Sequence, residues 1–223
     1  MRIGNIVLQS TPLPTPDKSL LAKAISDAIA KEGFHLLDWN KDIEQWQNRI
    51  LSLKKWNPQD LWPDVSTHTL LLTNSEWLTP YLNDIKKPED LKKIYLKEIL
   101  QYSLDQTLQQ QLDKLAPPKI KVPSGSFIEL EYQANGDVPV LPVRLQECFG
   151  MLTTPTVNNG SINVLMHLLS PAFRIVQITT DLQSFWNTGY FDVRKDLRSK
   201  YKKHYWPENP LEVEAIKGSK KRP

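Results

Sequence analysis

The sequence is poor in cysteine and glycine, and it has no long apolar run. Its 223 residues include one cysteine, Cys148, and eight glycines. A single cysteine excludes an internal disulfide and any zinc site that needs two or more thiolates, so we expect a chain from a reducing compartment. No stretch of about 18 apolar residues is free of charge, and residues 1–16 lack the pattern of a secretory signal. These absences predict a cytoplasmic protein with no membrane partner.

The eight glycines do not form any of the loops that cradle phosphates or carry a nucleophile. No glycine is followed by lysine, as an ATPase loop requires, and neither Gly-x-Gly-x-x-Gly nor Gly-x-Ser-x-Gly occurs. We interpret Ser124-Gly125-Ser126 as a turn and Cys148 as a small buried apolar residue. The four histidines are too dispersed to indicate a metal site: His35, His68, His167 and His204. We therefore expect no catalytic residue, metal ion or cofactor in this chain, which argues against a free-standing enzyme.

The charge is distributed unevenly along the chain. The composition, 40% apolar and 24% charged, is typical of a soluble globular protein. The net charge of +3 divides into −2 over residues 1–184 and +5 over residues 185–223. This asymmetry indicates either a polyanionic partner near the C-terminal end or a basic tail that keeps the chain soluble.

Residues 17–116 carry the periodicity of amphipathic helices. One helix is expected over residues 17–33, between an Asp17 cap and a terminating Gly33, and a second over residues 41–55. Residues 1–16 are expected to form an extended strand and a proline-rich connector. Further helices are expected to begin at Ser66, at Asn74 or Ser75, at Pro88 and at Asp105.

The periodicity changes at Pro117-Pro118. Helical turns are expected later at residues 144–149, 180–186 and 190–201, and a hairpin turn at Asn135-Gly136. Short strands are expected at 119–122, 127–132, 138–143, 162–168 and 175–179. The predicted fold class is therefore α+β: a helical N-terminal half over residues 17–116, then a small mixed α/β domain with short antiparallel strands over residues 117–210. Residues 211–223 are expected to form a flexible basic tail.

The segment from Phe185 to Trp206 combines aromatic residues with cations. On a helix that begins near residue 190, one row of side chains is apolar and the neighbouring row is cationic. Cations at this spacing can face the phosphates of single-stranded RNA, and bases can stack on aromatic side chains. The apolar row is Val193, Leu197 and Tyr201. The residues expected to bind RNA are Arg194, Arg198, Lys202 and Lys203, with Tyr205 and Trp206 as stacking partners.

Each of these assignments has a structural alternative. The cations can form a solvated helix face that Asp192 and Asp196 partly neutralise, and the aromatic residues are expected more often in the core. Arg144 is a second candidate for RNA contact, and its alternative is a salt bridge with Glu147.

A series of short motifs in the second half resembles the C-terminal domain of the HrpB family of bacterial DEAH-type ATP-dependent RNA helicases. The resemblance is strong over residues 112–210, and the upstream segment with Trp77-Leu-x-Pro-Tyr81 is similar more diffusely. The motifs include Leu115-Ala-Pro-Pro118, Val122-Pro-Ser-Gly-Ser126, Pro139-Val-Leu-Pro-Val-Arg-Leu-Gln-Glu147, His167-Leu-Leu-Ser-Pro171, Val193-Arg-Lys-Asp-Leu-Arg198 and His204-Tyr-Trp-Pro207.

The resemblance implies the non-catalytic C-terminal accessory region of such a helicase. ATP and Mg²⁺ are then expected only in the ATPase lobes, whose motifs this chain does not contain, so it is a fragment or a separately encoded piece. Its partners would be those lobes and single-stranded RNA. The alternative is a protein-interaction scaffold with no RNA contact, in which five tryptophans form a docking face: Trp39, Trp46, Trp56, Trp62 and Trp77.

Overall fold

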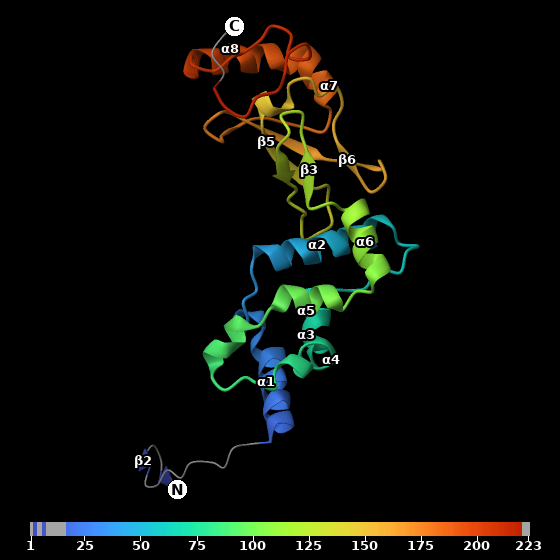
Figure 1. The fold of residues 1–223 in the computed structure, drawn as a ribbon, viewed down its shortest axis with the longest axis vertical. Coiled ribbons are helices and arrows are strands. Elements are labelled where there is room, and N and C mark those ends of the chain that lie inside the picture. The colour runs from blue at the N-terminus through green and yellow to red at the C-terminus, as the bar shows by residue number, and fades with distance from the viewer. Residues whose placement is uncertain (1, 4–5, 8–16, 220–223) are drawn as a thin grey trace. The chain divides into compact units, whose positions relative to one another are not determined.

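The computed structural model describes residues 2–3, 6–7 and 17–219, which fold into two compact units (Figure 1). One unit comprises Met1–Asn40 and Ser66–Ser103, and the other comprises Lys41–Val65 and Leu104–Pro223. The units alternate along the chain, whereas the sequence indicates one boundary near Pro117. Two short strands, β1 (Arg2–Ile3) and β2 (Ile6–Val7), pair antiparallel. The rest of the expected connector and the last four residues of the tail lie outside the described residues.

The first unit is helical, as the periodicity predicts. The Asp17 carboxylate accepts a hydrogen bond of 2.7 Å from the backbone N–H of Ser19, and the Ser66 hydroxyl accepts one from Thr69, so both predicted caps are confirmed. The elements are α1 (Lys18–Glu32), η1 (Phe34–Leu36), α3 (Thr67–Leu72), α4 (Asn74–Trp77), η2 (Thr79–Tyr81), η3 (Pro88–Lys93) and α5 (Leu96–Tyr102).

Two details of this unit differ from the expectation. The helix predicted to begin at Pro88 is divided, because Ile94 adopts an extended backbone (φ −66°, ψ 132°) between η3 and α5. Asn74 does not cap α4. Its amide donates to the backbone carbonyl of Ser26 and accepts from the Ser26 hydroxyl, which joins α4 to α1. A buried tertiary pair thus replaces the local cap.

Among the described residues, the second unit contains three helices of ten or more residues and three small sheets. The sheets pair β3 with β4, β5 with β8 and β9, and β6 with β7. The elements are α2 (Lys41–Trp56), α6 (Gln106–Leu115), β3 (Lys119–Lys121), β4 (Phe127–Glu129), β5 (Val140–Arg144), η4 (Leu145–Cys148), β6 (Thr156–Val157), β7 (Ile162–Asn163), β8 (Leu165–Leu169), β9 (Ile175–Thr179), α7 (Leu182–Ser184), η5 (Phe185–Gly189) and α8 (Tyr190–Lys200). A helical first half followed by short strands in mixed sheets confirms the predicted fold class.

The strand pairing differs from the hairpin expected around Asn135-Gly136. The turn itself forms, with Gly136 at φ 67°, but β4 pairs back with β3, and only one bridge, Glu131 to Val140, joins it to β5. Instead β5 pairs in parallel with β8, 20 or more residues away. The buried apolar side chains of β5 lie in the core, where β5 forms one edge of a sheet whose central strand is β8.

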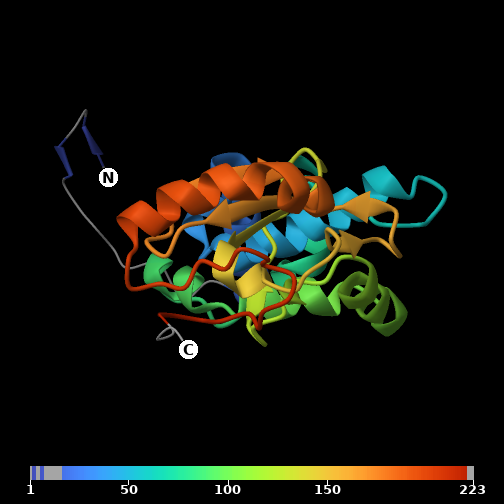
Figure 2. The same ribbon diagram turned by 90° about the horizontal axis from the view of Figure 1, so that it is seen from above.

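The C-terminal helices form one continuous run from α7 through α8. The π-helical turn η5 joins the two helices that the sequence predicts separately, and the Asp181 carboxylate caps the start. Both views show α8 lying over the sheet of β5, β8 and β9 (Figures 1 and 2). Phe149, Phe185 and Trp186 are buried, and each packs edge to face against the buried ring of Tyr190 at the start of α8.

The tryptophans do not form an exposed docking face. Trp46 and Trp62 are buried, and the other three are partly buried with internal partners. Trp39 stacks on Phe34, Trp56 donates to the Gly136 carbonyl, and Trp77 donates to the Leu70 carbonyl. The prediction that these tryptophans form a docking face is therefore wrong, because the rings pack within their own units.

Among the described residues, no helix has the length and apolar character needed to cross a bilayer.

Candidate nucleic-acid interface

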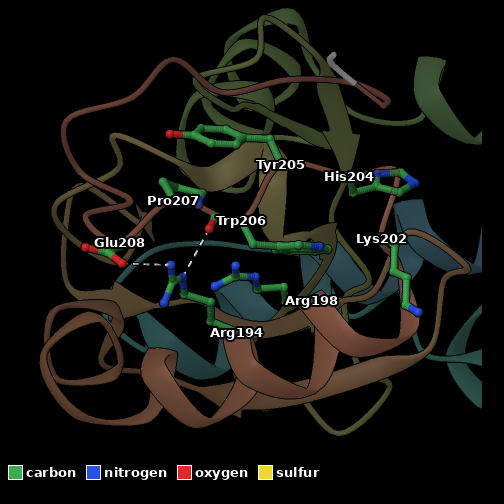
Figure 3. Close-up of a pocket in the computed structure, with 8 residues that line it drawn as sticks. All are labelled: Arg194, Arg198, Lys202, His204, Tyr205, Trp206, Pro207 and Glu208. Carbon is green, nitrogen blue, oxygen red and sulfur yellow. Dashed lines mark hydrogen bonds and ion pairs between the residues drawn. The ribbon is translucent and has the colours of Figure 1, made fainter. Parts of the chain in front are cut away.

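Helix α8 separates an apolar row from a cationic row as the sequence predicts. Leu197 is 2% exposed and Val193 is half-buried, and both line the side of the helix that faces β9. Three cations of the neighbouring row line a separate cavity of about 210 Å³, shown in Figure 3. This α8 cavity is lined by Arg194, Arg198, Lys202, His204, Tyr205, Trp206, Pro207 and Glu208.

The segment over residues 204–208 forms the opposite wall of the α8 cavity. The Tyr190 hydroxyl donates a hydrogen bond of 2.8 Å to the Pro207 carbonyl, and the Trp206 indole N–H donates to the Tyr201 carbonyl. Trp206 is 5% exposed. The chain therefore folds back along α8 because the Trp206 ring is buried, and the expectation that Trp206 stacks on a base is wrong.

The three cations of the cavity differ in their partners. Arg194 donates from Nε to the Trp206 carbonyl at 3.1 Å and pairs with Glu208 at 3.4 Å. Arg198 and Lys202 are exposed and have no hydrogen bond or ion pair with any residue of 17–219. Figure 3 shows the ends of Arg194 and Arg198 close together, with the Lys202 ammonium pointing away from both. Arg198 and Lys202 are thus the cations available to an anion.

The cavity also contains a histidine that the sequence analysis did not assign to it. His204 Nδ1 lies 2.9 Å from Oε1 of Gln146. Burial, and then the nearby positive charge of Arg144, lower the pKa of His204 below its ordinary value of 6.5, so the ring is neutral at pH 7. Tyr205 is half-buried, and its ring lies apart from the two arginines (Figure 3). It remains the aromatic candidate for stacking.

Arg144 is part of a separate internal cluster. Its guanidinium pairs with Glu147 at 2.7 Å and lies over the Phe173 ring, 5.4 Å from the centroid. The Ser124 hydroxyl donates to the other oxygen of Glu147 at 2.8 Å. The salt bridge, the structural alternative for Arg144, is therefore what forms, and Arg144 is not on the α8 cavity. Burial of Glu147 raises its pKa, but hydrogen bonds from Ser126, Ser124 and Arg144 outweigh burial, so the pKa is lowered overall.

Several other residues singled out in the sequence lie outside the α8 cavity. Lys203 is exposed but does not line the α8 cavity. Asp192 and Asp196 form no ion pair with a lysine within residues 17–219, so the expected neutralisation of the cationic row is absent there. Cys148 is fully buried, and burial raises the pKa of its thiol, as expected for a packing residue. Pro207 and Glu208 also line the cavity. The sequence did not predict this, because only the folding of the chain brings these two residues opposite Arg194.

Comparison with known proteins agrees with this architecture. A family model described as "ATP-dependent helicase C-terminal" matches residues 77–210. The ATP-dependent RNA helicase HrpB of Escherichia coli (strain K12) is 35% identical over 221 residues, which is 99% of this chain and 27% of that protein. The crystal structure of the E. coli DExH-box NTPase HrpB matches with a TM-score of 0.84 at 36% identity, over 96% of this chain and 26% of the other. A crystal structure of the E. coli DEAH/RHA helicase HrpB matches with a TM-score of 0.73 at 34% identity, over 92% of this chain and 26% of the other.

The fold is that of the C-terminal region of an ATP-dependent helicase. The chain belongs to the HrpB family, as the motifs after residue 112 indicate. It spans about a quarter of the length of the E. coli relative.

Proposed function

We propose that this chain is the non-catalytic C-terminal region of an HrpB-type RNA helicase, that it contacts single-stranded RNA through the α8 cavity, and that it docks onto the ATPase part of the helicase. The observation that carries the RNA contact is the pair of unpartnered cations, Arg198 and Lys202, beside Arg194. ATP hydrolysis and Mg²⁺ binding belong to the ATPase part in this proposal, since the chain has no phosphate-binding loop.

Charge and shape support RNA over a small anion. Arg198 is exposed on α8, and Lys202 and Lys203 are exposed in the segment just after this helix ends at Lys200, so none of these three cations is enclosed. Exposed cations of this kind can contact successive phosphates, and Tyr205, which is half-buried in the lining of the same cavity, offers a ring to a base. Each cation contributes a contact that depends on salt and is independent of base sequence. The isolated chain is expected to bind RNA weakly and without sequence preference. Its contacts would add to the RNA affinity that the ATPase part supplies.

Filter binding of poly-U tests this role. Replacing Arg198 and Lys202 together by alanine is expected to weaken binding roughly ten- to thirty-fold at about 0.1 M salt, because two phosphate contacts are lost. The matched control is the double change of Lys23 and Lys31, two exposed lysines on α1. It removes the same charge from the other unit and is expected to leave binding nearly unchanged. An equal loss in both variants would show a general charge effect, and no loss in the first would refute the site.

A further inference from the structure

The first unit carries a pocket lined by three exposed tyrosines. The cavity, of about 280 Å³, lies where η2 meets the start and end of α5. Tyr81 is 51% exposed, Tyr95 77% and Tyr102 76%. Their hydroxyl groups have no hydrogen bond to any residue of 17–219. We call this site, with Ile94, Glu98 and Ile99 as its other lining residues, the tyrosine pocket.

Helical spacing explains why the groups converge. Glu98 and Tyr102 lie four residues apart on one face of α5, and Tyr95, the residue just before the helix, lines the same pocket. Ile99, 6% exposed, is the buried apolar residue at the base of this face. Tyr81 comes from η2, which precedes this helix by 14 residues, and adds the third ring. The arrangement is an apolar aromatic hollow with one carboxylate.

The charge of the tyrosine pocket differs from that of the α8 cavity. Glu98 is the one carboxylate among the lining residues, and it has no hydrogen bond or ion pair with any residue of 17–219. No cation is among the lining residues, so a phosphate chain would meet a carboxylate with nothing to offset it. A cation, in contrast, is attracted both by that carboxylate and by the faces of aromatic rings within about 6 Å.

We propose that the tyrosine pocket binds an arginine or lysine side chain of the ATPase part of the helicase. This rests on the docking half of the proposed function and names the surface and the chemistry of that contact. The E. coli relative extends over nearly four times the length matched by this chain, so a large surface of the same polypeptide lies outside it. An exposed aromatic cluster of this kind is typical of an interface. Arginine is the better fit, because its planar guanidinium can stack on a tyrosine ring while it pairs with Glu98.

The chemistry of the pocket is tested with a small probe. The whole chain, labelled with ¹³C in its tyrosine rings, is titrated with N-acetylarginine amide and observed by NMR. The ring signals of Tyr81, Tyr95 and Tyr102 are expected to shift. N-acetylnorleucine amide, which has a similar stem and no charge, is expected to shift them several-fold less at the same concentration. Glu98→Gln is expected to weaken the arginine response at least three-fold, whereas Glu76→Gln, an exposed carboxylate outside the pocket, leaves it unchanged.

The occupant is tested with the ATPase part of the E. coli relative, prepared without the quarter that matches this chain. Its affinity for the whole chain is measured by biolayer interferometry. Glu98→Lys, and Tyr95→Leu with Tyr102→Leu, are each expected to weaken docking at least ten-fold. Replacing Arg198 and Lys202 by alanine is expected to leave docking unchanged. This variant therefore distinguishes the RNA site from the docking site.

The outcomes distinguish this inference from the proposal on which it rests. Docking that survives both tyrosine-pocket changes overturns the inference and leaves the docking proposal intact. No docking by the unaltered chain overturns both. If the ring signals respond equally to the norleucine probe, the pocket does not recognise charge and the inference is overturned. If the signals respond to oligo-U and not to arginine, the pocket is an RNA surface instead.

Discussion

The Nε group of Arg194 donates a hydrogen bond of 3.1 Å to the backbone carbonyl of Trp206, and so one residue of the cationic row also fixes the opposite wall of the α8 cavity. The Arg194 side chain is 19% exposed, and its second contact, with Glu208, is to a side chain that is 90% exposed. Arg194 therefore has a structural role that Arg198, one turn later, does not share.

Arg194→Ala and Arg198→Ala are expected to separate stability from RNA binding. Loss of the Arg194 bond leaves the Trp206 carbonyl without its donor, which is expected to cost about 1–2 kcal/mol of unfolding free energy. Arg198→Ala is expected to change stability by less than about 0.5 kcal/mol, because the side chain is exposed and unpartnered. Urea unfolding of both variants measures this difference. Equal destabilisation would contradict the assigned roles.

Arg49 is expected to be the more sensitive member of the Arg49–Asp113 pair. The side chain of Arg49 is 9% exposed and donates to the Ala116 carbonyl at 2.6 Å, to the Leu112 carbonyl at 3.3 Å and to Asp113 at 2.6 Å. Arg49→Met leaves the Ala116 carbonyl without this donor, whereas the Leu112 carbonyl still accepts from the backbone N–H of Ala116, and the expected cost is about 1–3 kcal/mol. Asp113→Asn is expected to cost less than about 1 kcal/mol, since Asp113 is 72% exposed. Chemical denaturation measures the free energy of unfolding of both variants. It shows whether Arg49 stabilises the fold mainly by capping the end of α6 or mainly by its ion pair with Asp113.

The Glu147 cluster is expected to make stability depend on pH in the acid range. Because the folded pKa of Glu147 lies below the ordinary value of 4.5, the stability it contributes is complete well above pH 4.5. That contribution is lost as the pH falls below 4.5 and through the folded pKa. Glu147→Gln is expected to cost about 2–3 kcal/mol at pH 7, and this difference from the unaltered chain is expected to shrink by pH 3. A difference that stays constant from pH 7 to pH 3 would contradict the ionised cluster.

His204 is expected to make RNA binding strengthen as the pH falls. Its pKa lies below 6.5, so the positive charge that the ring gains on the lining of the α8 cavity develops below pH 6.5. Affinity for oligo-U is expected to rise as the pH falls below 6.5, and this part of the rise is expected to be absent in His204→Gln. Fluorescence anisotropy at constant ionic strength is the measurement. An identical pH profile for the variant would place His204 outside the RNA contact.

Local features were predictable from the sequence, and long-range ones were not. The caps at Asp17, Ser66 and Asp105 need only neighbouring residues, and all three form. The parallel pairing of β5 with β8 depends on contacts across more than 20 residues, and the hairpin signal at Asn135-Gly136 competed with it. A turn motif specifies the reversal of the chain but not which strands then pair.

The candidate site shows the same division. The neighbouring positions of Arg194 and Arg198 on α8 follow from helical spacing, and the structure places Lys202, which lies beyond the end of the helix at Lys200, on the same cavity. The burial of Trp206 does not follow from spacing, since it depends on the return of the chain along α8 and on the bond from Tyr190 to Pro207. The sequence pattern around Arg144 permitted both a salt bridge and an RNA contact, and only the burial of Glu147 selects the first.

The salt dependence of RNA binding tests the central claim most directly. If Arg198 and Lys202 each contact a phosphate of single-stranded RNA, the two together are expected to contribute about −1.4 to the slope of the logarithm of the affinity for oligo-U against the logarithm of salt concentration. Arg198→Ala with Lys202→Ala is therefore expected to make the slope shallower by about 1.4. A slope that is the same in the unaltered chain and in this variant, or no binding at low salt, would contradict the account.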